Sequence, residues 1–214
     1  MCGRYRRRSD KQRIAELFQV TAGLEELYLA PEDDIAPGSV QPVVLTNNNG
    51  ERQIEMMRWG FKLPDRLLFN ARSEGIETAK FWAERFRTKR CIVPADTFFE
   101  WVKTAKGSKP KYEFGVPGRE PFGMAGLWSA WKNPKTEVWE DTFAILTGDA
   151  NSVMEPVHDR QPIILEPQEY AEYLASAERP PVHLLRVLPG EELRSQLLAE
   201  DRITQQQASF FDSV

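Results

Sequence analysis

The sequence predicts an α+β fold: a single domain with a mostly antiparallel, partly barrel-like β core and peripheral helices. Three observations carry this prediction. Many short runs rich in β-branched and aromatic residues are separated by turn residues, whereas helical patterns are few and lie between those runs. The chain of 214 residues is long enough for one substantial core. It also contains no internal repeat, low-complexity tract or long linker.

In the first half of the chain, two helices and one hairpin are predicted. Ser9-Asp10-Lys11-Gln12 is typical of a capping box, and an apolar stripe at helical spacing follows it. Residues 41–46 and 53–59 are β-rich and flank an Asn-Asn-Asn-Gly turn, which indicates a hairpin. Residues 76–86 space their aromatic side chains for burial on one side of a second helix.

In the second half, strands predominate. Pro167 opens a helix that continues to about Leu174, because proline is favoured in a first helical turn. The tail after Pro189 is polar, and we expect it to be helical or loose. The predicted strands are residues 91–93, 97–102, 112–116, 123–130, 143–147, 163–165 and 182–187.

The charge balance excludes little by itself. The formal net charge of −4 argues mildly against a nucleic-acid-binding protein. However, residues 1–139 contain 23 basic and 18 acidic side chains, whereas residues 140–214 contain 5 and 14. A basic body followed by an acidic third leaves nucleic-acid binding open, and we expect one basic groove with acidic surface elsewhere.

Other function classes are easier to exclude. No apolar run approaches the roughly 18 residues of a membrane span, and no secretory signal is recognisable, so we expect no membrane partner. Cys2 and Cys91 are too few for a disulfide scaffold and suit a reducing cytoplasm. A zinc cage of four ligands would need both cysteines and both histidines, His158 and His183. We therefore expect neither a metal nor another cofactor.

Three short motifs place a polar or reactive side chain two residues before an arginine. They are Cys2-Gly3-Arg4, Asn70-Ala71-Arg72 and His158-Asp159-Arg160. In an extended segment, residues i and i+2 share a face, so each chemical group would point the same way as a guanidinium suited to phosphate. Chance explains any one motif better, but three together make a functional interpretation about as good an explanation as chance.

Cys2 is the unusual residue among these. At a chain end it can be a small residue without a role. Alternatively, removal of Met1, which a small second residue permits, exposes an α-amine and a thiol on one residue. An α-amine titrates near about 8, so far more of it is nucleophilic at neutral pH than of a lysine. The amine can form an imine with an aldehyde, and the thiol can then close a five-membered thiazolidine ring.

Other candidate residues have both a structural and a chemical interpretation. Glu100 lies in an apolar strand, where partial burial would favour its neutral form and proton transfer near pH 7. His158 lies in a Pro-bounded loop, either as a structural histidine or as a general acid and base. Asn70 can hydrogen-bond an oxygen or an amine. Cys91 and His183 are expected to be structural, and most of the six tryptophans to be core residues.

A family resemblance rests on motifs that occur in order along the chain. They are residues 1–5 (MCGRY), 35–38 (IAPG), 57–60 (MRWG), 70–74 (NARSE), 90–96 (RCIVPAD), 99–101 (FEW), 125–128 (AGLW) and 157–160 (VHDR). Over roughly residues 1–166 the chain resembles the SOS response-associated peptidase (SRAP) family of abasic-site processing proteins. The likeness is weaker beyond Pro181. Asp34 stands where members usually carry Asn, and residues 61–64 also depart from the family pattern.

The resemblance implies a single SRAP domain over residues 1–214, with a divergent tail from about residue 188, acting as a monomer on single-stranded DNA with abasic sites. Mature Cys2 would form a thiazolidine with the ring-opened sugar aldehyde. Asn70 would orient the sugar and the Cys2 amine, and Glu100 would transfer protons. His158 would assist sugar-ring opening and any β-elimination. The DNA-binding positions it implies are Arg4, Arg72 and Arg160 for phosphates, Pro37 and Trp59 as an apolar wedge for bases, and Thr147 near the reacting site; Arg58 is expected to be a further DNA contact.

Two other functions fit the same terminus. An N-terminal-nucleophile peptidase or amidohydrolase would use the Cys2 thiol against an amide, with the Cys2 amine as base. A non-catalytic single-strand binding module would use the arginines and Trp59. A covalent adduct with abasic DNA distinguishes the crosslinking enzyme from both alternatives.

Overall fold

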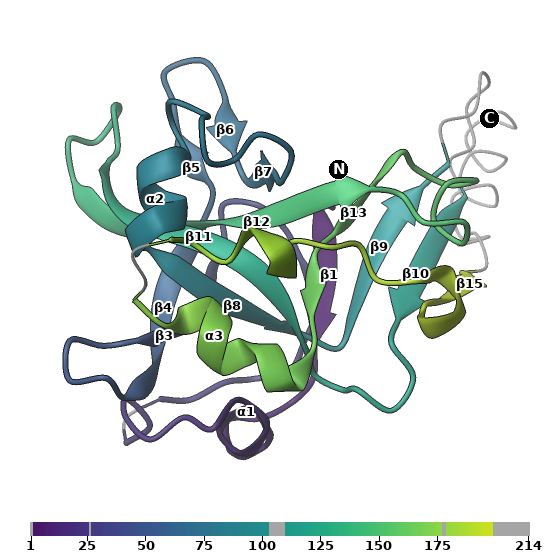
Figure 1. Ribbon diagram of the computed structural model, residues 1–214, viewed down its shortest axis with the longest axis horizontal. Coiled ribbons are helices and arrows are strands. Elements are labelled where there is room, and N and C mark those ends of the chain that lie inside the picture. The colour runs from purple at the N-terminus through teal and green to yellow at the C-terminus, as the bar shows by residue number, and fades with distance from the viewer. Residues whose placement is uncertain (1, 26, 103–109, 177–178, 199–214) are drawn as a thin grey trace, which may run out of the picture.

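The computed structural model describes residues 2–25, 27–102, 110–176 and 179–198, which form β sheets with short helices on the outside (Figure 1). The expected α+β class with a barrel-like core is confirmed. Among the described residues, no helix is both long and apolar enough to cross a membrane.

Five strands close into a barrel. They are β3 (Val40–Thr46), β4 (Arg52–Trp59), β8 (Arg90–Ala95), β11 (Phe122–Lys132) and β12 (Trp139–Asp149). Pairing runs from β12 to β4, β3, β8 and β11, and β11 pairs with β12 again, so that the ring has no free edge. All these pairs are antiparallel except β12 with β4, which is parallel.

Shorter strands extend the barrel and position the site. β7 (Asn70–Arg72) runs parallel to β12, and β13 (Arg160–Pro162) pairs antiparallel with the same strand nearer its C-terminal end. β14 (Ile164–Leu165) continues along β11. β5 (Phe61–Lys62) and β6 (Leu67–Leu68) form a separate small hairpin.

A second sheet of five antiparallel strands stands beside the barrel, in the order β15-β10-β9-β1-β2 (Figure 1). Its strands are β1 (Arg4–Arg7), β2 (Glu32–Ile35), β9 (Thr97–Trp101), β10 (Lys111–Gly115) and β15 (Arg194–Leu197). The first strand therefore lies in the interior of this sheet, between β2 and β9, which holds the start of the chain in place.

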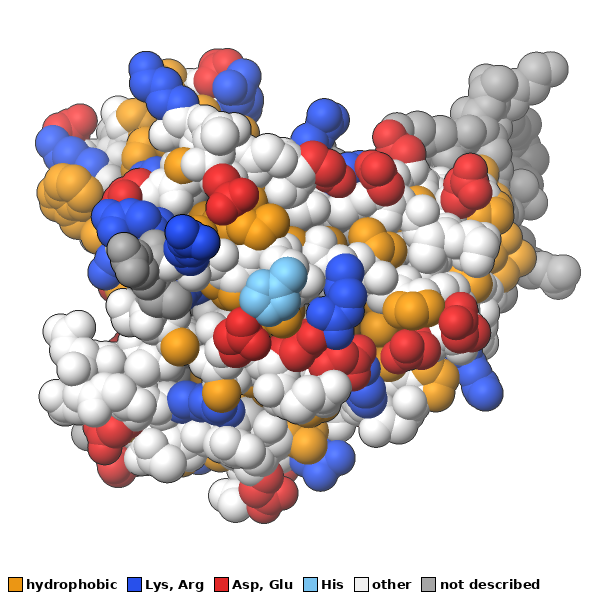
Figure 2. Space-filling model, in the orientation of Figure 1, with side chains coloured by type: hydrophobic (Ala, Val, Ile, Leu, Met, Phe, Trp, Pro, Cys, Tyr) orange, Lys and Arg blue, Asp and Glu red, His pale blue; other side chains and the backbone are white. Residues whose placement is uncertain are grey.

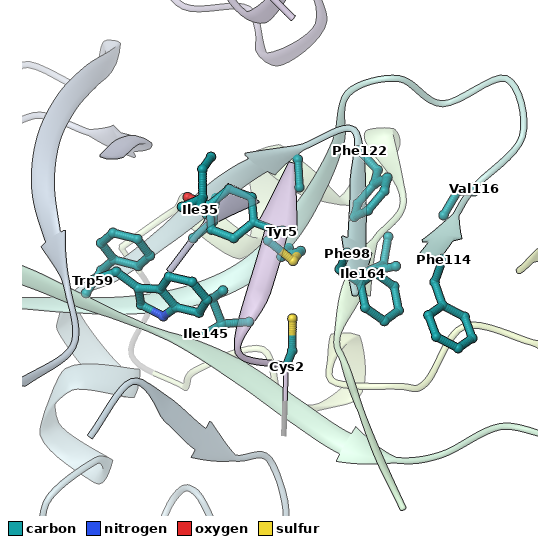
Figure 3. Packing of buried hydrophobic residues seen from close by; sticks show 14 of the residues in the cluster. Cys2, Tyr5, Ile35, Trp59, Phe98, Phe114, Val116, Phe122, Ile145 and Ile164 are labelled. Carbon is teal, nitrogen blue, oxygen red and sulfur yellow. The ribbon is translucent and has the colours of Figure 1, made fainter. Parts of the chain in front are cut away.

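Alternation along the barrel strands produces two apolar clusters. In β3, Val43 and Leu45 belong to an inner cluster, whereas Val44 between them belongs to an outer one. All five barrel strands contribute to the inner cluster, which places it in the barrel interior, and Tyr5 and Phe98 join it from the second sheet (Figure 3). The outer cluster is covered by helices.

The helices are short and peripheral. α1 (Lys11–Phe18) is capped by the Asp10 carboxylate, and its buried face packs on the outer cluster together with α3 (Tyr170–Leu174). α2 (Ala83–Thr88) leads directly into β8. The 3-10 turns are Pro167–Glu169, Val182–Leu184 and Gly190–Glu192.

Most predicted elements are confirmed, and three are not. The hairpin of β3 and β4, strands β8 to β12 and the helix after Pro167 are present. Residues 182–187 are not a strand but begin with a 3-10 turn, and helix α2 covers only the end of the predicted 76–86 segment. The tail after Pro189 contains strand β15, while residues 199–214 lie outside the described part.

Candidate functional site around Cys2

Cys2 lies immediately before β1, and its side chain is completely buried. Figure 3 shows it pointing into the inner cluster, near Tyr5 and between Ile145 and Phe98. The thiol lies 3.9 Å from the main-chain oxygen of Arg4. Because β1 is held on both sides by antiparallel partners, the main chain at Cys2 is positioned by the sheet rather than left as a loose end.

The surroundings keep the Cys2 thiol protonated. Burial raises the pKa of the thiol well above its ordinary range, and the nearby charge of Glu100 raises it further. Glu100 is itself buried on β9, opposite Tyr112 of β10. The structure therefore brings the predicted proton-transfer residue within electrostatic reach of the predicted nucleophile.

Asn70 contacts Cys2 directly. Its Nδ2 donates a hydrogen bond of 3.0 Å to the main-chain oxygen of Cys2. Asn70 reaches this position because β7 pairs with β12, which places Asn70 opposite Ile145 of the barrel wall. The side-chain oxygen of the same amide, Oδ1, is buried without a hydrogen-bond partner among the described residues, so its acceptor capacity is unused.

His158 is nearly buried in the loop before β13. Its Nδ1 accepts a hydrogen bond of 3.0 Å from the main-chain N–H of Arg160 and lies 2.9 Å from Oδ1 of Asp159. Accepting the amide proton at Nδ1 places the proton of a neutral ring on Nε2. The carboxylate of Asp159 is positioned to stabilise the ring when Nδ1 is also protonated.

Arg160 is held in a cage of acceptors. Its guanidinium donates two hydrogen bonds of 2.8 Å to the carboxylate of Glu74 and one of 2.6 Å to Asp149. It also donates to the main-chain oxygen of Thr147 at 2.5 Å, and the Thr147 side chain is buried beside it. Arg160 therefore ties β13 to the turn after β7, and its charge is already compensated in this structure.

The other arginines predicted to bind DNA differ in whether a carboxylate already contacts their side chain. Arg4 lies 3.2 Å from the carboxylate of Asp34, and Arg58 donates to Glu140 at 2.9 and 3.1 Å. Arg72 is exposed, and no carboxylate of the described residues lies within ion-pair distance of it. Of the four arginines, Arg72 is thus the one whose charge is most available.

The structure corrects the expectation for Trp59. Its side chain is completely buried, its Nε1 donates to the main-chain oxygen of Phe69 at 2.9 Å, and Tyr5 and Phe143 pack against its ring. A ring covered in this way cannot stack on a DNA base, so Trp59 supports the site from within the core. Pro37, by contrast, is partly exposed in the turn after β2.

The three motifs are brought to one region by pairing. β7 and β13 flank β12, so that Arg72 lies opposite Thr147 and Arg160 lies opposite Asp149 two residues further on. Glu74 and Asp149, the carboxylates that hold Arg160, were not assigned a role from the sequence, and Asp34 was noted only as a departure from the family pattern. Only Glu74, two residues after Arg72, carried a local clue of the same i, i+2 kind. Among the described residues, no group of three His, Cys, Asp or Glu side chains is arranged to hold a metal ion.

Comparison with known proteins adds three findings. The model of the family described as SOS response associated peptidase (SRAP) matches residues 1–203, which extends past the roughly 166 residues recognised from motifs. The abasic site processing protein YoqW of Bacillus subtilis is 29% identical over 195 residues, which cover 88% of this chain and 86% of YoqW. The abasic site processing protein YedK of Escherichia coli is 26% identical and covers 81% of this chain and 79% of its own length.

Solved structures show the same fold. A protein from Bacteroides thetaiotaomicron superposes with a TM-score of 0.82 at 21% identity and covers 95% of this chain and 94% of its own. A phage-related protein from Bordetella bronchiseptica superposes with a TM-score of 0.75 at 28% identity and covers 93% and 95%. The barrel and its neighbouring sheet are therefore shared across distant bacterial proteins.

Proposed function

Because the chain belongs to the SOS response associated peptidase (SRAP) family, we propose that it processes abasic sites in single-stranded DNA by bonding them covalently to its own Cys2. In this proposal Met1 is removed first, so that Cys2 presents both an α-amine and a thiol. The protein is a DNA-repair enzyme whose first product is its own adduct with damaged DNA.

The observation that carries the proposal is the contact between Asn70 and Cys2. The amide Nδ2 holds the Cys2 main-chain oxygen at 3.0 Å, and Glu100 acts on the thiol through its charge. These residues come from three separate segments, and each matches a family motif. A second-position cysteine without a role would not need a buried amide and a buried carboxylate around it.

The chemistry balances without an added reagent. The Cys2 amine attacks the aldehyde carbon of the ring-opened abasic sugar, and loss of water leaves an imine. The thiol then adds across the C=N bond: sulfur bonds to carbon and the thiol proton ends on nitrogen. In this proposal Glu100 carries these protons, first to the departing hydroxyl and then from sulfur to nitrogen.

The raised pKa of the Cys2 thiol favours this order of steps. A buried thiol that stays protonated is a poor first nucleophile, because the thiolate is the reactive form. An uncharged amine needs no ionisation to attack an aldehyde.

The remaining residues have supporting roles in the proposal. His158, with its ring proton on Nε2, opens the deoxyribose ring by donating to the ring oxygen or accepting from the C1 hydroxyl. Asn70 uses its free Oδ1 to orient the sugar or the amine. Arg72 binds a phosphate, while Arg4 and Arg58 exchange a carboxylate for a phosphate when DNA arrives. The family match through residue 203 supports one domain along the chain.

The proposal is tested by incubating the mature protein, verified by intact mass to lack Met1, with single-stranded DNA that carries one abasic site. A denaturing gel should show a slowly migrating adduct for the wild type and for Cys91→Ala, the matched control with the other buried cysteine. Cys2→Ala should abolish it.

Cys2→Ser separates the amine from the thiol. This variant keeps the amine but lacks sulfur, so its adduct should appear only when borohydride reduces the imine. The absence of any adduct in the wild type, or an adduct that persists in Cys2→Ala, would refute the proposal. A non-catalytic binding module would show neither adduct.

A further inference from the structure

A cavity of about 870 Å³ is lined by none of the residues that the proposed mechanism uses. It opens where the β3–β4 hairpin turn meets the C-terminal ends of α2 and α3; we call it the hairpin cavity. β4 extends from Arg52 at this cavity to Trp59. Because the lining includes neither Cys2 nor Asn70, Glu100 or His158, the hairpin cavity is a separate site.

The charged side chains that line the hairpin cavity are all of one sign. Arg52, Lys89 and Arg90 line it, and none of the described lining residues is Asp or Glu. In a chain of net charge −4, most arginines elsewhere contact a carboxylate, as Arg58 and Arg160 do. Three cations without a carboxylate in one hollow create a positive potential that an anion would neutralise.

Arg90 shows how this charge is held. It is buried in the wall, and its guanidinium has no carboxylate partner among the described residues. It donates instead to the main-chain oxygens of Phe86, Arg87, Tyr173 and Ala175, at the ends of α2 and α3. The carbonyl oxygens at these helix ends carry partial negative charge, so they stabilise the guanidinium and offset part of its positive charge.

Arg52 and Lys89 stand on two further sides of the cavity. Arg52 is half-buried and donates to the main-chain oxygen of Phe18 at 2.8 Å, which fixes its direction. Lys89 is exposed, and its ammonium group sits 4.3 Å from the ring centre of Trp128. The main-chain N–H of Trp128 donates to the oxygen of Lys89, so the strand pairing sets this stacked position.

The other walls suit a flat, polar group next to an anion. Trp128 is half-buried and gives an apolar surface, and Thr46 and Asn48 offer hydroxyl and amide groups that pair with the edges of a base. The volume lies within the 300–1,000 Å³ typical of small-molecule sites. We propose that the hairpin cavity binds a nucleotide phosphate, with Lys89 and Arg52 on the phosphate and Trp128 beside the base.

The test is calorimetric titration of the full chain with deoxythymidine monophosphate at low salt. Inorganic phosphate and thymidine, the two halves of the ligand, are titrated separately. The nucleotide should bind at least tenfold more tightly than either half. Lys89→Gln should weaken binding about tenfold, whereas Lys80→Gln, an exposed lysine outside the cavity, should leave it within twofold. Arg90 is left unchanged because its hydrogen bonds hold two helix ends.

A second arm identifies the source of the phosphate. In this arm an undamaged oligothymidylate of ten nucleotides replaces the mononucleotide. If Lys89→Gln weakens binding of the oligonucleotide tenfold but not that of the mononucleotide, the site binds a phosphate of a DNA strand, which supports the inference. Equal binding by Lys89→Gln and Lys80→Gln in both arms overturns it, as does phosphate binding as tightly as the nucleotide. Cys2→Ala should bind the nucleotide normally, so this outcome is independent of the proposed crosslinking.

Discussion

One carboxylate, Asp34, controls how free Arg4 is to bind a phosphate. The two side chains lie 3.2 Å apart and are both substantially exposed, so the pair contributes at most about 1 kcal/mol. Asp34→Asn removes the competing charge while keeping the shape. We expect it to tighten binding of undamaged single-stranded DNA two- to fivefold, because Arg4 no longer exchanges partners.

Fluorescence polarisation with a labelled oligonucleotide measures this effect. Asp65→Asn is the matched control, since it removes the same charge from an exposed residue paired weakly with Arg66 at 3.8 Å. Equal affinities for the two variants would show that Arg4 does not bind DNA.

Sequence patterns identified candidate residues for the site, but they could not show where the fold places each side chain. Cys2, Asn70 and Glu100 were singled out by chemistry and motif, and the structure brings them together. Trp59 was assigned to base stacking, yet it is buried. A tryptophan beside arginine and glycine looks the same in a wedge and in a core, because burial depends on strands distant in the sequence such as β1 and β12.

At the scale of elements, the start of α1 tests whether a capping residue recognised in the sequence stabilises the helix. Oδ1 of Asp10 accepts a hydrogen bond of 2.8 Å from the main-chain N–H of Arg13, which satisfies one of the free donors at the helix start. Asp10→Ala should lower the free energy of unfolding by about 1 kcal/mol, measured by urea denaturation.

Asp10→Asn is the informative companion variant. Asparagine caps helices about as well as aspartate, so this variant should retain most of the stability. An equal loss in both variants would assign the effect to the charge of Asp10 instead of to the cap.

Elements with strong local patterns were predicted, whereas those formed by tertiary pairing were not. β3 and β4 have β-rich runs around a glycine turn at Gly50, whose φ of +82° suits glycine. β1 and β2 are rich in charged residues and become strands because neighbours pair with them. Residues 182–187 are apolar, but they follow Pro181 and contact the outer cluster from a 3-10 turn.

For the whole molecule, folding brings basic and acidic side chains from the two parts of the chain together. The excess of basic residues in 1–139 and of acidic residues in 140–214 is therefore largely cancelled. Arg58 of the basic body contacts Glu140, Arg119 contacts Glu166, and Arg160 of the acidic third contacts Glu74. On the face in Figure 2, blue and red side chains accordingly lie intermingled. The expected basic groove therefore depends on the arginines that have no ion pair within the described part of the chain, such as Arg72 in the motif that contains Asn70.

This distribution predicts a shallow salt dependence for DNA binding. Each phosphate contact contributes about −0.7 to the slope of log affinity against log salt for single strands. An arginine that exchanges a carboxylate for a phosphate loses an internal ion pair, which offsets part of the gain from the phosphate contact. We therefore expect Arg72 to provide the largest single share of the affinity. The wild-type slope should lie between about −0.7 and −2.

Arg72→Gln tests this expectation, because it should reduce the magnitude of the slope by about 0.7 and weaken binding at low salt. Arg87→Gln is the control: Arg87 is exposed and paired with Glu84 on α2, so its removal should leave the slope unchanged. A steep slope that neither variant changes would place the DNA on another surface. The hairpin cavity, with three cations and no carboxylate among its described lining residues, is the surface such a result would favour.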